Sequence, residues 1–324
     1  MNSIYPPKIW LEKEADFNLY GYVPMIAPCI VMIVLFGILT VAHSIQTILY
    51  RQWWTVILPI GTLAEVGGYI PRLIGHSKTR LRDPYVATMC LLIITPCLFA
   101  AVHFTILGRV ATLFPRKYSA IRPIFVMPVF VTIDVVSLVI QGVGAGTAGG
   151  SDSASDAQIG SHIAVAGVAI QLFGYVMFML LFLYFSYLQY RNPAPGIEQF
   201  KWLMIGVFCS SMLIILRSVY RVVELAMGFD GVINTTEWVL YAFDGAFVFV
   251  AVAILNIFHP GKYLPKDFSW KYNPEAYARP DDEKGIHEDA EAKNDTFDNA
   301  IAPPIDEKKI HAKDTQPHAG QEDP

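Results

Sequence analysis

The sequence is poor in charged residues, and this scarcity excludes most soluble proteins. Asp, Glu, Lys and Arg make up 16% of the 324 residues, whereas about a quarter is usual for a soluble globular protein. Hydrophobic residues make up 54%, and they gather in runs of about 20 residues, long enough to cross a hydrocarbon layer about 30 Å thick. The runs are 23–49, 54–73, 85–107, 124–143, 162–188, 202–222 and 238–258. The composition therefore predicts an all-α, polytopic membrane protein with seven transmembrane helices.

Motifs of several membrane-protein classes are also missing. The predicted last span, 238–258, has no lysine that would hold retinal as a Schiff base. A metal-dependent intramembrane hydrolase would need several histidines placed to bind the metal. No H-x-x-x-H pattern occurs, and His43, His103 and His259 are scattered. This function therefore ranks third, after the two considered below. Four cysteines fall in predicted spans without zinc-ligand spacing, and we expect them to be buried apolar fillers. They are Cys29, Cys90, Cys97 and Cys209. We predict no metal and no cofactor.

A glycine-rich stretch, QGVGAGTAGGS at 141–151, superficially suggests a phosphate-binding loop. It lacks the G-K-[ST] ending and a preceding soluble strand, so we predict a flexible outer loop. Without a nucleotide motif, any transport has to be downhill or coupled to an ion. No basic, aromatic surface occurs outside the predicted spans, and we predict no nucleic-acid partner.

Segments outside the spans predict the organisation and orientation of the chain. We expect an extracytoplasmic N-terminal tail at 1–22 without a cleaved signal peptide, a transmembrane domain at 23–260, and a charged, disordered cytoplasmic tail at 261–324. Lys and Arg are concentrated in loops that lie inside if the N-terminus is outside, and the 144–161 and 225–236 loops have none. This bias predicts N-out, C-in. A glycosylation sequon at Asn234 agrees with it, although another at Asn294 falls in the predicted inner tail.

Four predicted spans carry ionisable and polar side chains at helical spacing. Residues three, four or seven apart return to nearly the same face of a helix. A charged side chain near the bilayer centre costs about 2.5–3.5 kcal/mol on the insertion scale. We therefore expect these side chains to face inward and to form one polar cluster or wet cavity in the outer half of the bundle. They are Glu65, Tyr69, Arg72, Asp134, Gln141, Arg217, Arg221, Glu224, Glu237, Tyr241 and Asp244.

Two interpretations of this cluster stay open from the residues alone. In one, interhelical ion pairs fix helix packing, since the planar guanidinium of arginine bonds carboxylates bidentately. In the other, the same groups also meet a substrate, because ionisable residues inside membranes often mark transport pathways. The two roles are compatible with each other.

The same residues carry a resemblance to a known family. The patterns are E-x-x-G-Y-x-x-R at 65–72, D-x-x-S-x-x-x-Q-x-x-G at 134–144, R-x-x-Y-R-x-x-E at 217–224 and E-x-x-x-Y-x-x-D at 237–244, closed by the His-Pro pair at 259–260. In this order and spacing they resemble the fungal lipid-translocating exporter family, also called RTA-like after resistance to aminocholesterol. The resemblance covers roughly residues 20–260; the first span matches less well and the tail not at all.

This resemblance implies a fungal seven-helix protein of the plasma membrane or another cell membrane. It implies export or translocation of amphiphilic lipids such as sphingoid long-chain bases, and tolerance to toxic lipids or drugs, with membrane lipids and an amphiphilic substrate as partners. Because the histidines are scattered, we predict that the protein is not an enzyme. Joining chemistry to resemblance, we hypothesise that Glu65, Asp134 or Asp244 receives the ammonium group of such a base. The alternative is a seven-helix receptor or sensor of lipid stress, although the receptor-type endings of spans three and seven are absent.

Overall fold

The computed structural model describes residues 23–77, 82–114, 122–150, 154–227 and 236–265. The chain divides into two compact units, Met1–Pro274 and Glu275–Pro324, and every described residue belongs to the first. The predicted N-terminal tail, most of the predicted C-terminal tail and the sequon at Asn234 lie outside the described residues.

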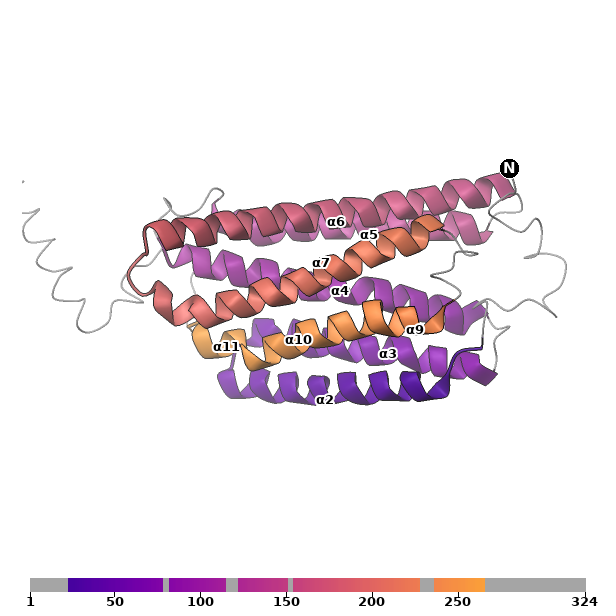
Figure 1. Cartoon of the computed structure of the whole chain (residues 1–324), viewed down its shortest axis with the longest axis horizontal. Helices are drawn as coiled ribbons and strands as arrows, with labels where there is room; N and C mark the ends of the chain where they lie inside the picture. The colour runs from indigo at the N-terminus through magenta and orange to yellow at the C-terminus, as the bar shows by residue number, and fades with distance from the viewer. Residues whose placement is uncertain (1–22, 78–81, 115–121, 151–153, 228–235, 266–324) are drawn as a thin grey trace, which may run out of the picture. The chain divides into compact units, whose positions relative to one another are not determined.

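The described ranges contain helices and no strand (Figure 1). The long helices are α2 (Ile26–Tyr50), α3 (Ile57–Ser77), α4 (Arg82–Thr112), α5 (Pro123–Gly150), α6 (Ala154–Arg191) and α7 (Lys201–Met227). The last segment consists of α9 (Glu237–Val239), the π-helix η4 (Leu240–Ala246) and α10 (Phe247–Ile257), and the short helix α11 (Pro260–Tyr263) follows it. Two 3₁₀ turns, η1 (Trp53–Val56) and η3 (Ile197–Phe200), lead into α3 and α7.

Six of the helical segments in the described part are long and apolar enough to cross a membrane. They are Ile26–Tyr50, Val86–Thr112, Pro123–Thr147, Gln158–Arg191, Ile197–Met227 and Glu237–Tyr263. The predicted span 54–73 corresponds to α3, which is not among the six. Glu65 and Arg72 give α3 a more polar composition, and both side chains are buried. The part of the chain that the structure describes is therefore all-helical and has six candidate spans, which makes the protein a multi-pass membrane protein.

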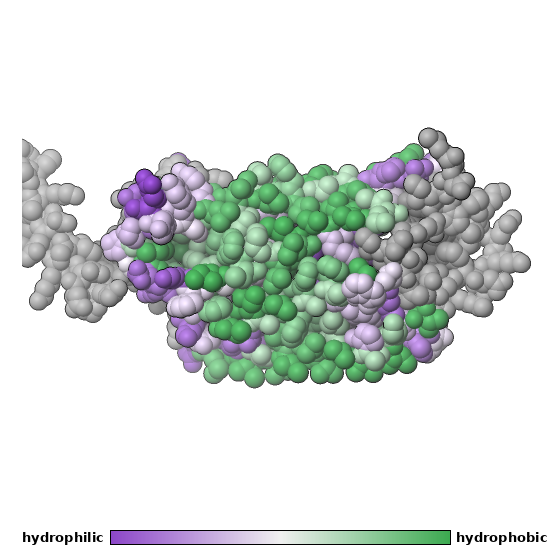
Figure 2. Space-filling view, in the orientation of Figure 1, coloured by the Kyte–Doolittle hydropathy of each residue, from purple (hydrophilic) through white to green (hydrophobic). Residues whose placement is uncertain are grey.

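Helices that follow one another in the chain also lie side by side, so most packing is local. α2 contacts α3, α3 contacts α4, α4 contacts α5 and α5 contacts α6, while α10 lies against both α7 and α2 (Figure 1). Apolar side chains cover the middle of the face in Figure 2, and hydrophilic residues gather toward its two ends. Large apolar residues such as Ile38, Val139 and Phe173 are more than half exposed, as expected for side chains that face lipid.

The prediction of a flexible loop at 141–151 is wrong, because α5 continues as a helix to Gly150. The physical reason is a close approach of α5 to α6. A Cβ at Gly144 would lie 2.3 Å from the backbone nitrogen of Ala164 and 2.6 Å from the carbonyl oxygen of Gly160. Small residues allow such contacts between membrane helices, so glycine here serves helix packing.

The four cysteines divide into two pairs of different environment. Cys29 and Cys97 are buried, as expected, whereas Cys90 and Cys209 are exposed and so are not interior fillers. A free thiol behaves as a small hydrophobic group, which suits an apolar surface as well as a core. All four are free.

A candidate polar site within the helix bundle

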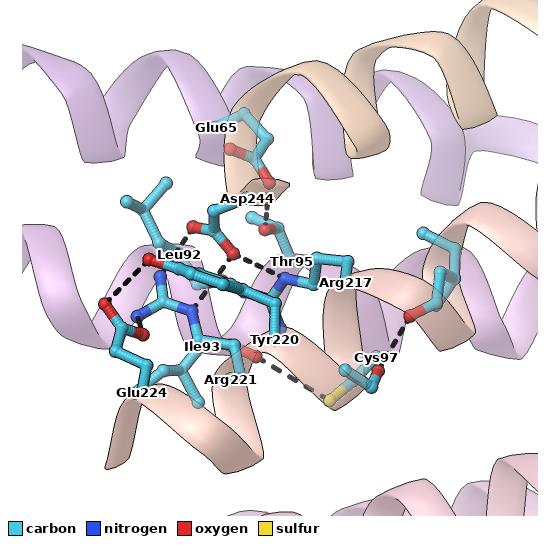
Figure 3. A network of polar contacts seen from close by, with 12 residues as sticks. Glu65, Leu92, Ile93, Thr95, Cys97, Arg217, Tyr220, Arg221, Glu224 and Asp244 are labelled. Atoms are coloured by element: carbon cyan, nitrogen blue, oxygen red, sulfur yellow. Dashed lines mark hydrogen bonds and ion pairs between the residues drawn. The ribbon is translucent and has the colours of Figure 1, made fainter. Parts of the chain in front are cut away.

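Two arginines of α7 bind one carboxylate of the last helical segment. Arg217 and Arg221 are four residues apart and therefore share a face of α7. Nε of Arg217 lies 2.6 Å from Oδ1 of Asp244, and Nη2 of Arg221 lies 2.5 Å from Oδ2 (Figure 3). Nε of Arg221 also donates to Oδ1 at 3.0 Å. The three side chains are 3–5% exposed, so this predicted contact between α7 and the last span is present and buried.

Glu224 completes this group on α7. Nη1 of Arg221 lies 2.9 Å from Oε2 of Glu224, and the hydroxyl of Tyr220 donates to Oε1 at 3.1 Å (Figure 3). The group thus contains two guanidiniums and two carboxylates, whose formal charges cancel. Pairing and hydrogen bonding offset the large cost of removing these charges from water. We call Arg217, Arg221, Glu224 and Asp244 the α7 ion-pair group.

Asp244 and Tyr241 lie in the π-helix η4, in place of the regular α-helix expected from their spacing. A π-turn is wider than an α-turn, and such turns occur frequently at functional sites. Gly245 follows Asp244 and lets another side chain approach, since a Cβ there would lie 2.6 Å from the Tyr69 hydroxyl oxygen. Tyr69 of α3 stacks beside Tyr241, with ring centroids 6.2 Å apart.

Arg72 forms a second polar group with the start of the last span. Its Nε donates to the Tyr241 hydroxyl at 3.1 Å, and its Nη2 lies 3.4 Å from Oε1 of Glu237. The Tyr241 hydroxyl donates to the same oxygen at 3.0 Å. The Glu237 carboxylate also accepts from the backbone N–H of Met25, at 2.9 and 3.0 Å. This group therefore connects α3, α9 and the residue before α2.

Glu65 lies beside the α7 ion-pair group without pairing with it. Its Oε1 accepts a short hydrogen bond from the hydroxyl of Thr95 on α4 (Figure 3). Asp244, Arg217 and Arg221 are all within electrostatic range of Glu65. Glu65 is 2% exposed, so Thr95 supplies the local donor that this buried carboxylate requires.

Arg217 has a second role that involves a proline of α4. Its Nη2 donates to the carbonyl oxygen of Leu92 at 2.6 Å (Figure 3). Residue 96, four positions on, is proline and has no N–H for the regular helical bond to that carbonyl. Arg217 therefore replaces the missing main-chain donor. In membrane helices a neighbouring helix can satisfy a carbonyl that proline leaves free, and Arg217 of α7 does so here.

Asp134 stands apart from these groups. It is 4% exposed, its Oδ2 has no hydrogen-bond donor among the described residues, and no ion pair involves it there. The Cys97 thiol and the Tyr175 hydroxyl are within electrostatic range of its carboxylate. The single cluster expected from helical spacing is therefore divided, with Asp134 outside the ion-paired part.

Gln141, two turns along α5, also has its own partners. Its Nε2 donates to Oε1 of Gln171 on α6 at 3.0 Å, and Nε2 of Gln171 lies 2.8 Å from Sγ of Cys97 on α4. The side chains form a polar chain across α5, α6 and α4. Neither Gln171 nor the Thr95 donor was singled out from the sequence, because a lone polar residue in an apolar span carries no spacing signal.

A further buried polar group surrounds His103, which is fully buried on α4. Its Nδ1 lies 2.6 Å from the Tyr175 hydroxyl, and its Nε2 lies 2.9 Å from Oγ of Ser210. The Ser210 hydroxyl donates to the carbonyl oxygen of Ala251 at 2.8 Å. Within the described ranges no three His, Cys, Asp or Glu side chains are placed to hold a metal ion. This hydrogen-bonded group thus joins α4, α6, α7 and, through Ser210, α10.

The buried ion pairs, the helical architecture and the apolar surface define a multi-pass membrane protein with a polar interior. The chain belongs to the RTA1-like family, because the family described as "RTA1 like protein" matches residues 58–267. This confirms the resemblance inferred from the four patterns.

Curated relatives extend over most of the chain. Protein RTA1 of Saccharomyces cerevisiae is 32% identical over 273 residues, which cover 75% of this chain and 85% of the relative. The sphingoid long-chain base transporter RSB1 of the same species is 29% identical over 290 residues, covering 78% and 76%. The S. cerevisiae protoporphyrin uptake protein 1 is 27% identical over 284 residues, covering 75% and 92%. No solved structure matches.

Proposed function

We propose that this protein is a translocator that exports cationic, single-chain amphiphiles such as sphingoid long-chain bases, and that it is not an enzyme. One relative is named a sphingoid long-chain base transporter, which supports this substrate class. The observation that carries the proposal is the buried Asp134 carboxylate, whose Oδ2 has no donor among the described residues. A buried carboxylate without partners is costly, and a substrate ammonium group would supply the missing positive charge.

The other carboxylates of the interior are less suited to receive a cation. Asp244 binds two arginines, and Glu224 binds Arg221 and Tyr220. Glu237 accepts from Arg72, Tyr241 and the Met25 backbone. Glu65 accepts from Thr95, and two arginines lie within electrostatic range of it. Of the three carboxylates hypothesised to receive the ammonium group, we therefore favour Asp134.

Polar groups near Asp134 suit the hydroxyls of a long-chain base. Gln141 lies seven residues further along α5, a rise of about 10 Å, and its amide joins the chain through Gln171 to Cys97. A head group that moves along α5 would thus contact first the Asp134 carboxylate and then the amides of Gln141 and Gln171. The hydrocarbon tail of the substrate would remain between helices or in lipid. A porphyrin that bears carboxylates would be repelled by Asp134, so we favour a cationic cargo.

We further propose that α3 is a seventh crossing and that the protein lies N-out, C-in in the plasma membrane. α3 follows α2 after the short 51–56 connection and packs along both α2 and α4. Its charged side chains, Glu65 and Arg72, are buried against other helices. α3 can therefore cross a membrane although it is less hydrophobic than the other spans. Two measurements on intact cells test this topology. We expect a glycosidase to remove a glycan from Asn234, and we expect a C-terminal tag to be protected from external protease. Digestion of the tag in intact cells contradicts it.

Liposomes containing the purified protein and a fluorescent sphingoid base test the proposed activity. We expect the wild type to move the base across the bilayer and Asp134→Asn to abolish the movement at equal reconstitution. Thr132→Asn, an exposed position on the same helix, is the matched control and should retain movement. Failure of the wild type to move the base, with binding of the base intact, supports the alternative that the protein is a membrane sensor of lipid stress.

A further inference from the structure

A groove lies where α6 turns into α7. It is formed by the last turns of α6, the 193–198 connection and the first turns of α7, and it has a volume of about 590 Å³. This volume is within the range of about 300–1,000 Å³ typical of small-molecule sites. Lys201 at its edge is sixteen residues before Arg217, a distance of about 24 Å along α7. The groove is therefore separate from the α7 ion-pair group.

The walls of the groove are apolar and its edge is polar. Aromatic and aliphatic side chains line it, namely Phe182, Phe185, Met204, Ile205 and Phe208. Ile205 is 41% exposed, which leaves this wall open to the surface that we assign to lipid. Hydrocarbon chains match such a wall, because apolar side chains offer them contacts without a desolvation penalty.

A buried amide in the lining has an unused donor. Gln189 is 6% exposed, and its Oε1 accepts from the backbone N–H of Ala194 at 3.1 Å. Its Nε2 has no acceptor in the part of the chain that the structure describes. Buried polar groups without a partner are rare in native proteins and call for an explanation. An oxygen atom of a ligand in the groove would accept this hydrogen bond.

The edge of the groove also carries one charge of each sign. Glu198 of η3 and Lys201 at the start of α7 both line it and are exposed. Neither side chain makes a hydrogen bond or an ion pair within the described ranges. A ligand head group that holds an anion and a cation close together would complement both charges.

We propose that the groove binds one phospholipid whose head group combines a phosphate with a primary ammonium, as in phosphatidylethanolamine. Lys201 contacts the phosphate, Gln189 donates to a phosphate or ester oxygen, and Glu198 accepts from the ammonium group. The acyl chains lie along the wall that includes Ile205. This site is independent of the proposed transport through Asp134. It would hold a bound lipid at the start of α7, whereas the α7 ion-pair group lies toward the end of that helix.

Native mass spectrometry of the purified full chain, titrated with phosphatidylethanolamine, phosphatidylcholine or phosphatidylglycerol, tests the site. We expect the first phosphatidylethanolamine to bind the wild type about tenfold more tightly than the other two lipids, since only its ammonium donates hydrogen bonds to Glu198. Ile205→Trp, which fills the groove, and Glu198→Ala, which removes the acceptor for the ammonium group, should each remove this preference. Leu216→Trp is the matched control, because Leu216 is an exposed α7 residue outside the groove, and it should keep the preference.

Four outcomes overturn the proposal. Equal binding of all three lipids to the wild type shows only unspecific surrounding lipid, and loss of the preference in Leu216→Trp shows a general effect of bulk. Displacement of phosphatidylethanolamine by added sphingoid base assigns the groove to the transport substrate. A change from one oligomeric state to another in Ile205→Trp assigns it to contact between copies of this chain. We expect the Ile205→Trp variant still to move sphingoid base. Failure of lipid binding in the groove can therefore be distinguished from failure of transport through Asp134.

Discussion

The Asp244 carboxylate binds the Arg221 guanidinium bidentately, with Oδ2 2.5 Å from Nη2 and Oδ1 3.0 Å from Nε. Each side chain is 3% exposed, and the two belong to different helical segments. Parallel bonds of this kind fix both distance and orientation. The pair thus determines how α7 and the last span face each other.

Asp244→Asn should destabilise the protein by about 3–5 kcal/mol, because removing one partner of a buried pair leaves an uncompensated charge. Two arginines, Arg217 and Arg221, lose their shared carboxylate in this variant. Thermal unfolding of the purified protein and its abundance in the membrane measure the effect. Asp134→Asn is the matched control, because it removes a carboxylate without an ion pair in the described part, and it should keep wild-type abundance. Equal abundance of both variants would contradict a structural role for Asp244.

Thr95→Val should lower the free energy of unfolding by about 1–3 kcal/mol, the cost of leaving a buried polar group unsatisfied. The change removes the hydroxyl that donates to Glu65 and keeps the shape of the side chain. Thr95→Ser retains the hydroxyl and should recover most of the loss in a thermal unfolding experiment. Thr132→Val, at an exposed hydroxyl that bonds only within its own helix, should have little effect.

Gly144→Ala should destabilise the protein by about 1–3 kcal/mol through overpacking. The added methyl group would meet main-chain atoms of α6 at Ala164 and Gly160, which cannot move aside as a side-chain end does. Gly146→Ala is the matched control, since a Cβ there meets nothing within 4 Å. Thermal unfolding of the two variants side by side measures the difference. If both behave alike, the close α5–α6 contact is not a source of stability.

Tyr241→Phe should cost about 1–3 kcal/mol, because the lost hydroxyl bridges two ionised groups. That hydroxyl accepts from Arg72 and donates to Glu237. Chemical denaturation in detergent, monitored by tryptophan fluorescence, measures the change. Tyr187→Phe, at a position 54% exposed, should leave stability unchanged. A Tyr241→Phe variant as stable as the wild type would show that Arg72 and Glu237 do not require the bridge.

Part of the site follows from the sequence by elementary physics. Arg217, Arg221 and Glu224 have the spacing of one helical face, and their cost in lipid requires carboxylates on another helix. Asp244 is such a carboxylate, and the structure places it between the two arginines. The helical class and most spans follow in the same way from hydropathy and length.

The remaining arrangement depends on how each helix is rotated about its axis, which no local pattern contains. Asp134 is seven residues from Gln141, as Glu65 is from Arg72, yet Asp134 forms no ion pair within the described ranges. The glycine-rich composition of 141–151 suggested a loop, whereas Gly144 lies at a close contact between α5 and the main chain of α6. The π-helix at Leu240–Ala246 could not be predicted from the sequence either, because π-turns are rare and the spacing of Glu237, Tyr241 and Asp244 fits a regular α-helix.

The hydrogen bond from Arg217 to the Leu92 carbonyl couples positions 96 and 217, which lie far apart in the chain. With proline at 96, the Leu92 carbonyl has no main-chain donor, and the Arg217 guanidinium donates to it instead. With alanine at 96, the main-chain N–H would compete for the same carbonyl oxygen. We therefore expect positions 96 and 217 to be epistatic, so that the effect of a substitution at one depends on the residue at the other. A protein with alanine at 96 should therefore tolerate loss of the Arg217–Leu92 hydrogen bond better than a protein with proline there, while both still need Arg217 for the ion pair with Asp244.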